Sequence, residues 1–116
     1  MSKKIIAVSG GFDPIHVGHL RMLQGAAELG SLTVIINSDA WLERKKGYVF
    51  MPWEERAEII SAFECVDNVI EAKDDDKTVC ESLRAIRPDV FANGGDRGAG
   101  NTPESRLCEE LGIELK

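Results

Sequence analysis

Long hydrophobic runs and positive charge are both scarce in this chain. No apolar run approaches the roughly 20 residues that a bilayer-spanning helix needs. The start, MSKK before a short apolar run, lacks the hydrophobic core of a signal peptide. Lys and Arg total 14 against 20 Asp and Glu, a formal net charge of −6. We therefore expect a cytoplasmic protein with no membrane partner and no nucleic-acid partner, because nucleic-acid binders need surplus basic side chains.

Cysteine is scarce as well. Cys65, Cys80 and Cys108 are odd in number, widely spaced and in no CxxC arrangement. This pattern predicts reduced thiols in mostly apolar settings, without a nucleophilic role. With 116 residues and 43% hydrophobic content, the chain fits one compact domain. We expect residues 1–116 to form this single domain.

Apolar runs alternate with segments of helical periodicity along the whole chain. Short continuous apolar runs are typical of strands covered on both faces. The alternation predicts an α/β fold, with a doubly wound parallel sheet of about five strands in the order 3-2-1-4-5 and helices on both faces. The expected strands are 4–9, 32–36, 66–72, 89–92 and 113–116, and the expected helices are 17–29, 52–64, a segment ending near 86, and 103–111.

The most informative stretch is VSGGFDPIHVGH, at 8–19. Gly10 and Gly11 permit a turn whose peptide N–H groups approach a ligand closely. His16 and His19 share one face of the following helix, and Gly18 leaves the first turn open. The pattern favours a phosphate cradle with two imidazole donors. Two alternatives are a half-built metal site and a pair of core histidines bonded to the backbone.

A basic run, RKK at 44–46, follows the second strand in an otherwise acidic protein. Such a run is often only a solvated surface. Here it follows a strand whose carboxyl end should lie beside the first loop, where ligands of open α/β sheets bind. Aromatic residues surround the run and could form an apolar contact surface or fill the core beneath the loop. They are Trp41, Tyr48, Phe50 and Trp53.

A second glycine-rich loop, NGGDRGAG at 93–100, follows the fourth strand. Strands 1 and 4 of the expected sheet flank its topological switch point, so both glycine-rich loops should border one crevice. The acidic cluster Asp74–Asp76 is better explained as a helix cap than as a metal site, because consecutive side chains do not converge on one ion.

The stretch GGFDPIHVGH resembles the HxGH signature of the nucleotidylyltransferase superfamily, and the chain looks cytidylyltransferase-like. The downstream elements NSD, RKKG and GGD are most similar to the glycerol-3-phosphate cytidylyltransferase and heptose-1-phosphate adenylyltransferase branch. This resemblance covers almost the whole chain. It implies a Rossmann-like fold, a nucleotidyltransferase that works with Mg²⁺ bound to a nucleoside triphosphate, and a homodimer.

The resemblance also implies roles for particular residues, none of them a metal ligand. Nucleotidyl transfer needs positioning and charge stabilisation rather than a protein nucleophile. The implied catalytic residues are His16, His19 and Lys46; the nucleotide-binding residues are Gly10, Gly11, Phe12, Asp13, His16, Gly18, His19, Gly94, Gly95 and Asp96; and the residues for substrate phosphate are Lys45, Lys46 and Arg56.

The expected reaction transfers a nucleoside monophosphate to a small phosphorylated substrate and releases pyrophosphate. CTP is the favoured nucleotide, with glycerol 3-phosphate or a sugar phosphate as acceptor. An ATP-using adenylyltransferase of the heptose-phosphate type and a non-catalytic nucleotide-binding module are the alternatives. A metal-dependent hydrolase that uses His16 and His19 as ligands is a further rival. Family domains normally continue to a Ser/Thr-rich motif that contacts nucleotide phosphates, and we expect this segment to be missing from 1–116.

Overall fold

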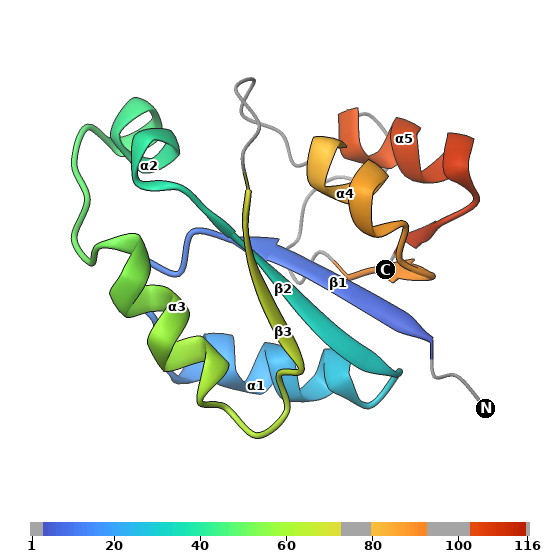
Figure 1. The fold of residues 1–116 in the computed structure, drawn as a ribbon, viewed down its shortest axis with the longest axis horizontal. Coiled ribbons are helices and arrows are strands. Elements are labelled where there is room, and N and C mark those ends of the chain that lie inside the picture. The colour runs from blue at the N-terminus through green and yellow to red at the C-terminus, as the bar shows by residue number, and fades with distance from the viewer. Residues whose placement is uncertain (1–3, 73–79, 93–102, 116) are drawn as a thin grey trace.

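The computed structural model describes residues 4–72, 80–92 and 103–115. Strands and helices alternate along the chain, as the hydrophobic pattern predicts (Figure 1). The strands are β1 (Ile5–Gly10), β2 (Ser31–Asn37), β3 (Asn68–Ala72), β4 (Val90–Phe91) and β5 (Glu114–Leu115). The helices are α1 (Val17–Ala27), α2 (Asp39–Lys46), α3 (Trp53–Ser61), α4 (Cys80–Ile86) and α5 (Pro103–Leu111).

The described strands form one parallel sheet in the order β3-β2-β1-β4-β5. This confirms the predicted Rossmann-like topology. The chain reverses its direction of winding between β1 and β4, which are paired neighbours. Gly10 lies opposite Ile36 in the register, so the carboxyl ends of β1 and β2 lie at the same edge of the sheet. The loop after β1 and helix α2 therefore start from adjacent points.

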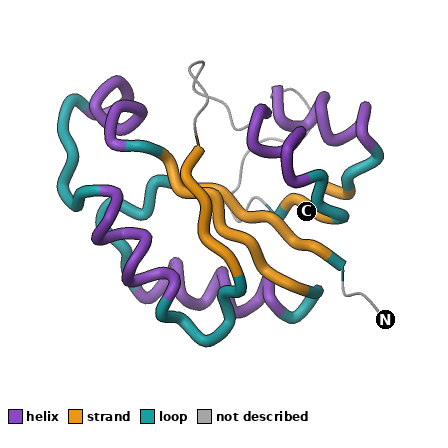
Figure 2. Tube along the Cα trace, in the orientation of Figure 1, coloured by secondary structure: helices purple, strands orange, loops and turns teal. Residues whose placement is uncertain are grey.

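Helices cover both faces of the sheet, and a separate hydrophobic core lies on each (Figure 2). Ile6 and Val8 of β1 pack with Leu23 of α1 and Ile60 of α3. Ala7, between them in the strand, belongs to the other core, because successive side chains of a strand point to opposite faces. That second core includes Leu83 of α4, Phe91 of β4 and Leu107 of α5.

Helix α2 lies in a region where no helix was predicted from the sequence. Its start and stop signals are present in the sequence. Ser38 is the N-cap and its hydroxyl accepts a hydrogen bond from the Trp41 amide at 3.1 Å. Gly47 ends the helix in the left-handed conformation with a φ of 87°. Three basic residues occupy the last turn, where their positive charges interact favourably with the negative end of the helix dipole.

The end of α1 also differs from the prediction. The helix stops at Ala27 with Glu28 as a right-handed C-cap, and Gly30 is not one of the described glycines with positive φ. Glycine is needed at position 30 because the backbone of Lys4 lies close to it. A Cβ atom there would collide with the carbonyl group of Lys4, because the Ser31 amide donates to that carbonyl at 2.8 Å as β2 begins beside β1.

Two predicted features lie outside the described residues: the helix cap at Asp74–Asp76 and the second glycine-rich loop at 93–100. Gly94, Gly95 and Asp96 are therefore still predictions as nucleotide-binding residues. Within the described ranges, no helix is both long and apolar enough to cross a membrane.

Candidate functional site

The two histidines of the HxGH stretch form the N-terminal cap of α1. His16 is the N-cap, with an extended backbone, and its Nδ1 accepts a hydrogen bond from the Gly18 amide at 3.1 Å. His19, one turn later, returns the contact, because its Nδ1 accepts from the His16 amide at 3.1 Å. The two side chains thus bind two helix-end amides that have no partner within the helix.

This capping box fixes the tautomer of both imidazoles. A ring nitrogen that accepts a hydrogen bond carries no proton, so each neutral ring has its proton on Nε2. The rings are stacked, with centroids 3.8 Å apart and planes 30° apart. Burial, and secondarily the charge of the neighbouring His16, lowers the pKa of His19 below its ordinary value of 6.5. The site therefore offers a pair of Nε2–H donors with His19 neutral at pH 7.

The positions of His16 and His19 exclude one alternative and weaken another. His16 is exposed and His19 half-buried, so they are not core residues, although both bind the backbone. No group of three or more His, Cys, Asp or Glu side chains that could hold a metal occurs within residues 4–72, 80–92 and 103–115. The described geometry thus suits an anion better than a metal ion.

Small residues in this stretch make room for neighbouring rings. A Cβ on Gly18 would lie 2.9 Å from Cε1 and 3.0 Å from Nδ1 of His16, so glycine allows the imidazole to pack on the helix start. A Cβ on Gly10 would lie 3.1 Å from the ring of Phe12. Phe12 is buried with a φ of 54°, and its ring meets His19 edge to face at 5.0 Å between centroids. Gly10, Gly18 and Phe12 thus determine how the two histidine rings pack.

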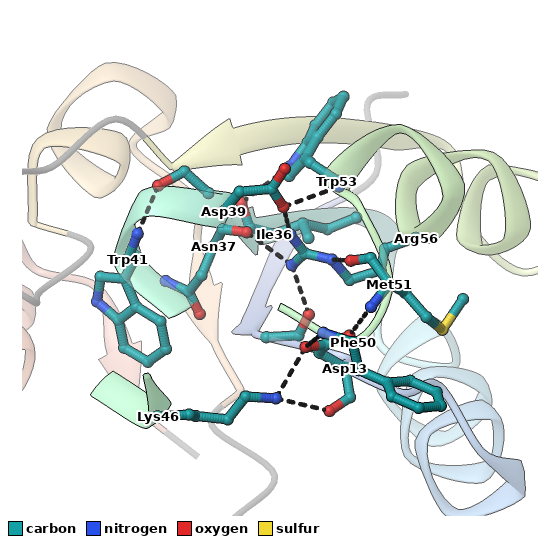
Figure 3. A network of polar contacts seen from close by, with 12 residues as sticks. Asp13, Ile36, Asn37, Asp39, Trp41, Lys46, Phe50, Met51, Trp53 and Arg56 are labelled. Carbon is teal, nitrogen blue, oxygen red and sulfur yellow. Dashed lines mark hydrogen bonds and ion pairs between the residues drawn. The ribbon is translucent and has the colours of Figure 1, made fainter. Parts of the chain in front are cut away.

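Asp13 and Lys46 come together across 33 positions of sequence, as Figure 3 shows. Lys46 Nζ donates to Asp13 Oδ2 at 2.8 Å and to the Asp13 carbonyl oxygen at 3.1 Å. Burial raises the pKa of the Asp13 carboxyl, but hydrogen bonds from Lys46 and from the Phe50 and Met51 amides outweigh it, so the net pKa lies below the ordinary value. The predicted approach of the basic run to the first loop is therefore present in the fold.

Arg56 is fully buried, so it is not an ordinary surface arginine. Its guanidinium donates to the carbonyl oxygens of Met51, Gly11 and Asn37 at 2.9, 2.8 and 2.7 Å. It also pairs with Asp39 Oδ1 at 2.6 Å. These contacts hold together the loop after β1, the end of β2 and the start of α3 (Figure 3). A role for Arg56 in binding substrate phosphate stays a prediction, and it would require the exchange of one of these partners.

Asp39 is a residue of this network whose role the sequence analysis did not identify. Its Oδ1 accepts from the Trp53 amide at 2.9 Å and so caps the start of α3, in addition to binding Arg56. An acidic residue after a strand, followed by a helix that begins with Pro-Trp-Glu-Glu, does not reveal this partner, because 14 positions separate Asp39 from Trp53. Only the fold brings them together.

The aromatic residues around α2 differ in burial. Trp53 packs against the first core, and its indole N–H donates to the Ile36 carbonyl at 3.3 Å. Tyr48 and Phe50 are instead 58% and 66% exposed. Lys45 is exposed, with its Nζ 4.9 Å from the centroid of the half-buried Trp41 ring. The predicted homodimer and the predicted phosphate contact of Lys45 stay predictions.

A parallel sheet of order 3-2-1-4-5 with an HxGH pair capping the first helix defines a member of the nucleotidylyltransferase superfamily. The family model described as cytidylyltransferase-like matches residues 7–111, and the chain belongs to this family. Two similar proteins are both named bifunctional protein HldE. The one from Streptomyces coelicolor is 40% identical over 93% of this chain and 24% of its own length. The one from Geobacter sulfurreducens is 39% identical over 97% of this chain and 24% of its own length.

The chain thus spans about a quarter of the length of the curated relatives that it matches. Among solved structures, the lipopolysaccharide core biosynthesis protein from Thermoplasma volcanium superposes with a TM-score of 0.76 and 25% identity, over 97% of this chain and 92% of that one. A protein of unknown function from Archaeoglobus fulgidus superposes with a TM-score of 0.67 at 19% identity, over 99% of this chain and 87% of that one. The second likeness supports the fold alone.

Proposed function

We propose that this domain transfers the AMP moiety of ATP to the phosphate group of a sugar phosphate and releases pyrophosphate. An oxygen of the acceptor phosphate attacks the α-phosphorus, and the bond from that phosphorus to the bridging oxygen of the β-phosphate breaks. The protein supplies no nucleophile in this reaction. The observation that carries the proposal is the pair of imidazoles at the start of α1, both with Nε2–H free of the capping contacts.

The two imidazoles would donate to oxygens of the α- and β-phosphates, where charge builds in the transition state. Donors held in place before the reaction need no reorganisation when the charge develops, which is why such groups contribute strongly to catalysis. The capping bonds hold both rings, and the stacking against each other and the edge contact with Phe12 restrict them further. The positive end of the α1 dipole adds to the attraction for phosphate.

Lys46 would bring a positive charge to the same phosphates or to the acceptor phosphate. Its ammonium is tied to Asp13 in the loop that leads into α1, while the side chain remains 26% exposed. Mg²⁺ favours several oxygen ligands, whereas the described donors are two imidazoles and an ammonium group. These residues do not form a Mg²⁺ site, so the ion would arrive with the triphosphate, and we assign no step to it.

The choice of nucleotide follows the relatives. Proteins named HldE match over almost the whole chain, which supports the heptose-phosphate adenylyltransferase alternative better than a CTP-using enzyme for glycerol 3-phosphate. The domain would then act on a sugar phosphate as its second substrate. CTP remains the second candidate, because the family description is cytidylyltransferase-like.

Pyrophosphate release tests the proposal directly. The chain is mixed with Mg²⁺ and either ATP or CTP, against a panel of sugar, polyol and amino-alcohol phosphates. We expect release with ATP and a sugar phosphate. Release only with CTP would move the assignment to the second candidate, and ATP binding in calorimetry without any release would support a non-catalytic nucleotide-binding module.

A site variant and a matched control locate the activity. Lys46→Met should lower turnover by roughly tenfold or more, since it removes one charged contact to phosphate. Lys4→Met changes an exposed lysine before β1, at the opposite end of the strand from the histidines, and should leave turnover unchanged. Equal losses in the two variants would contradict the site assignment. Activity that depends on a bound transition metal would instead favour the hydrolase rival.

A further inference from the structure

The carboxylate of Asp13 is placed between two parts of the site and is itself closed to ligands. Its side chain is only 1% exposed, although the loop that carries it leads directly into the helix of the two histidines. One oxygen accepts from Lys46 Nζ at 2.8 Å and from the Phe50 amide at 2.8 Å. The other accepts from the Met51 amide at 2.5 Å. A carboxylate buried in this way cannot touch a nucleotide, but it can hold groups that do.

The contact leaves Lys46 able to bind an anion. An ammonium group has three N–H donors, and two of them are directed at the carbonyl and carboxylate oxygens of Asp13. The Tyr48 ring lies 4.7 Å from Nζ on the following loop. Lys46 is therefore held at the last turn of α2 from one side, with one donor left for a phosphate oxygen. Without Asp13, its flexible four-carbon stem could carry the charge away from the site.

The same carboxylate fixes the segment 48–51 that connects α2 to α3. Tyr48 and Phe50 of this segment are largely exposed, so apolar burial does little to hold them. Arg56 Nε donates to the Met51 carbonyl oxygen at 2.9 Å, at the far end of the segment. The hydrogen bonds from the Phe50 and Met51 amides to the Asp13 carboxylate are charge-assisted, and therefore stronger than neutral ones, and they add the restraint from the side of the histidines. The loop after β1, Lys46 and the 48–51 segment thus meet at the side chain of Asp13 (Figure 3).

We propose that Asp13 is a positioning residue. It holds Lys46 and the 48–51 segment in fixed positions relative to the histidines of α1, and its carboxylate does not itself bind the nucleotide. The role of Lys46 rests on the proposed function. The hold on the 48–51 segment does not, so the two parts can be tested separately.

The first experiment measures limited proteolysis by chymotrypsin, with mass spectrometry to locate cuts after Tyr48 and Phe50. Cleavage requires local opening of the segment. Asp13→Asn keeps the size of the side chain but removes its charge, and we expect these two cuts to become at least about tenfold faster. The matched control is Asp67→Asn. Asp67 accepts from Leu32 N at 3.2 Å and Ser31 Oγ at 2.9 Å at the amino end of β2, far along the strand from the site.

Wild-type cleavage rates in Asp13→Asn, or the same acceleration in Asp67→Asn, would overturn the proposal. If Asp13→Asn does not fold, amide hydrogen exchange on the wild-type chain decides the matter. The Phe50 and Met51 amides should then exchange at least about tenfold more slowly than unstructured amides. Exchange at the unstructured rate would refute the hold on this segment.

The second experiment is a double-mutant cycle on kcat/KM for pyrophosphate release. If Asp13 acts through Lys46, Asp13→Asn should cost little in a chain that already carries Lys46→Met, although it lowers kcat/KM about tenfold by itself. Losses that multiply would show independent roles and refute the positioning of Lys46. A wild-type chain that releases no pyrophosphate defeats the proposed function instead, and the cycle is then run on ATP affinity by calorimetry with the same criterion.

Discussion

His16 has two functions that substitution can separate, because it caps α1 through Nδ1 and offers Nε2–H to a ligand. His16→Ala removes both. Replacing a capping side chain by alanine costs about 1 kcal/mol, which lowers the thermal midpoint of a domain of this size by about 4 °C. Loss of the Nε2 donor should cost about 3 kcal/mol of transition-state stabilisation, or a factor of about a hundred in kcat.

His16→Ser is the matched variant. A serine hydroxyl is a preferred N-cap and can accept from the amide that the imidazole now binds, so the free energy of unfolding should stay within about 0.5 kcal/mol of the wild-type value. Serine is too short to replace the imidazole N–H at a phosphate. We therefore expect His16→Ser to be as stable as wild type and as slow as His16→Ala.

Two measurements check this pair: denaturant unfolding for stability, and single-turnover pyrophosphate release for chemistry. Near-normal turnover in His16→Ser would refute the role of the imidazole as a phosphate donor. Equal instability of the two variants would refute the cap as the source of the stability difference. The first result concerns the donor role of Nε2–H and the second concerns the cap, so the two functions of His16 are tested separately.

Three further predictions concern residues of the same site. Gly18→Ala should displace the His16 ring and lower turnover by about tenfold or more, while Gly25→Ala in the same helix, where a Cβ meets nothing within 4 Å, should raise stability by about 0.5–1 kcal/mol without affecting turnover. Because burial, then the nearby His16 charge, lowers the pKa of His19, the unfolded chain binds more protons as the pH falls below 6.5. The thermal midpoint of the wild-type chain should therefore fall as the pH is lowered from 6.5 through the folded-state pKa of His19. The fall should be smaller in His19→Gln, and an equal fall in the two chains would contradict the linkage. Arg56→Lys should lower the free energy of unfolding by about 3 kcal/mol in urea titrations, because lysine cannot make the four contacts of the buried guanidinium, and a loss below about 1 kcal/mol would contradict this.

Much of the fold could be predicted from the sequence because the burial of a strand shows in its local pattern of apolar residues. Runs such as Ile5–Val8 are apolar without alternation, and that pattern requires cover on both faces of a parallel sheet. The order of the strands followed from the handedness and shortness of their connections. Helix α2 was missed because its composition is mostly polar, although Ser38 and Gly47 mark its ends. A short helix with one buried side chain, Leu42, gives little periodic signal.

By itself, the sequence determined the family, the topology and the pairing of His16 with His19, because each depends on residues close together in the chain or on hydrophobic period. The tertiary structure alone decided what Asp13 and Arg56 contact. Their partners lie up to 45 positions away, and a lone charged residue carries no sign of which backbone groups will surround it. Both side chains are buried, where charges require specific partners, and the folded chain supplies those partners only when its loops meet at the edge of the sheet.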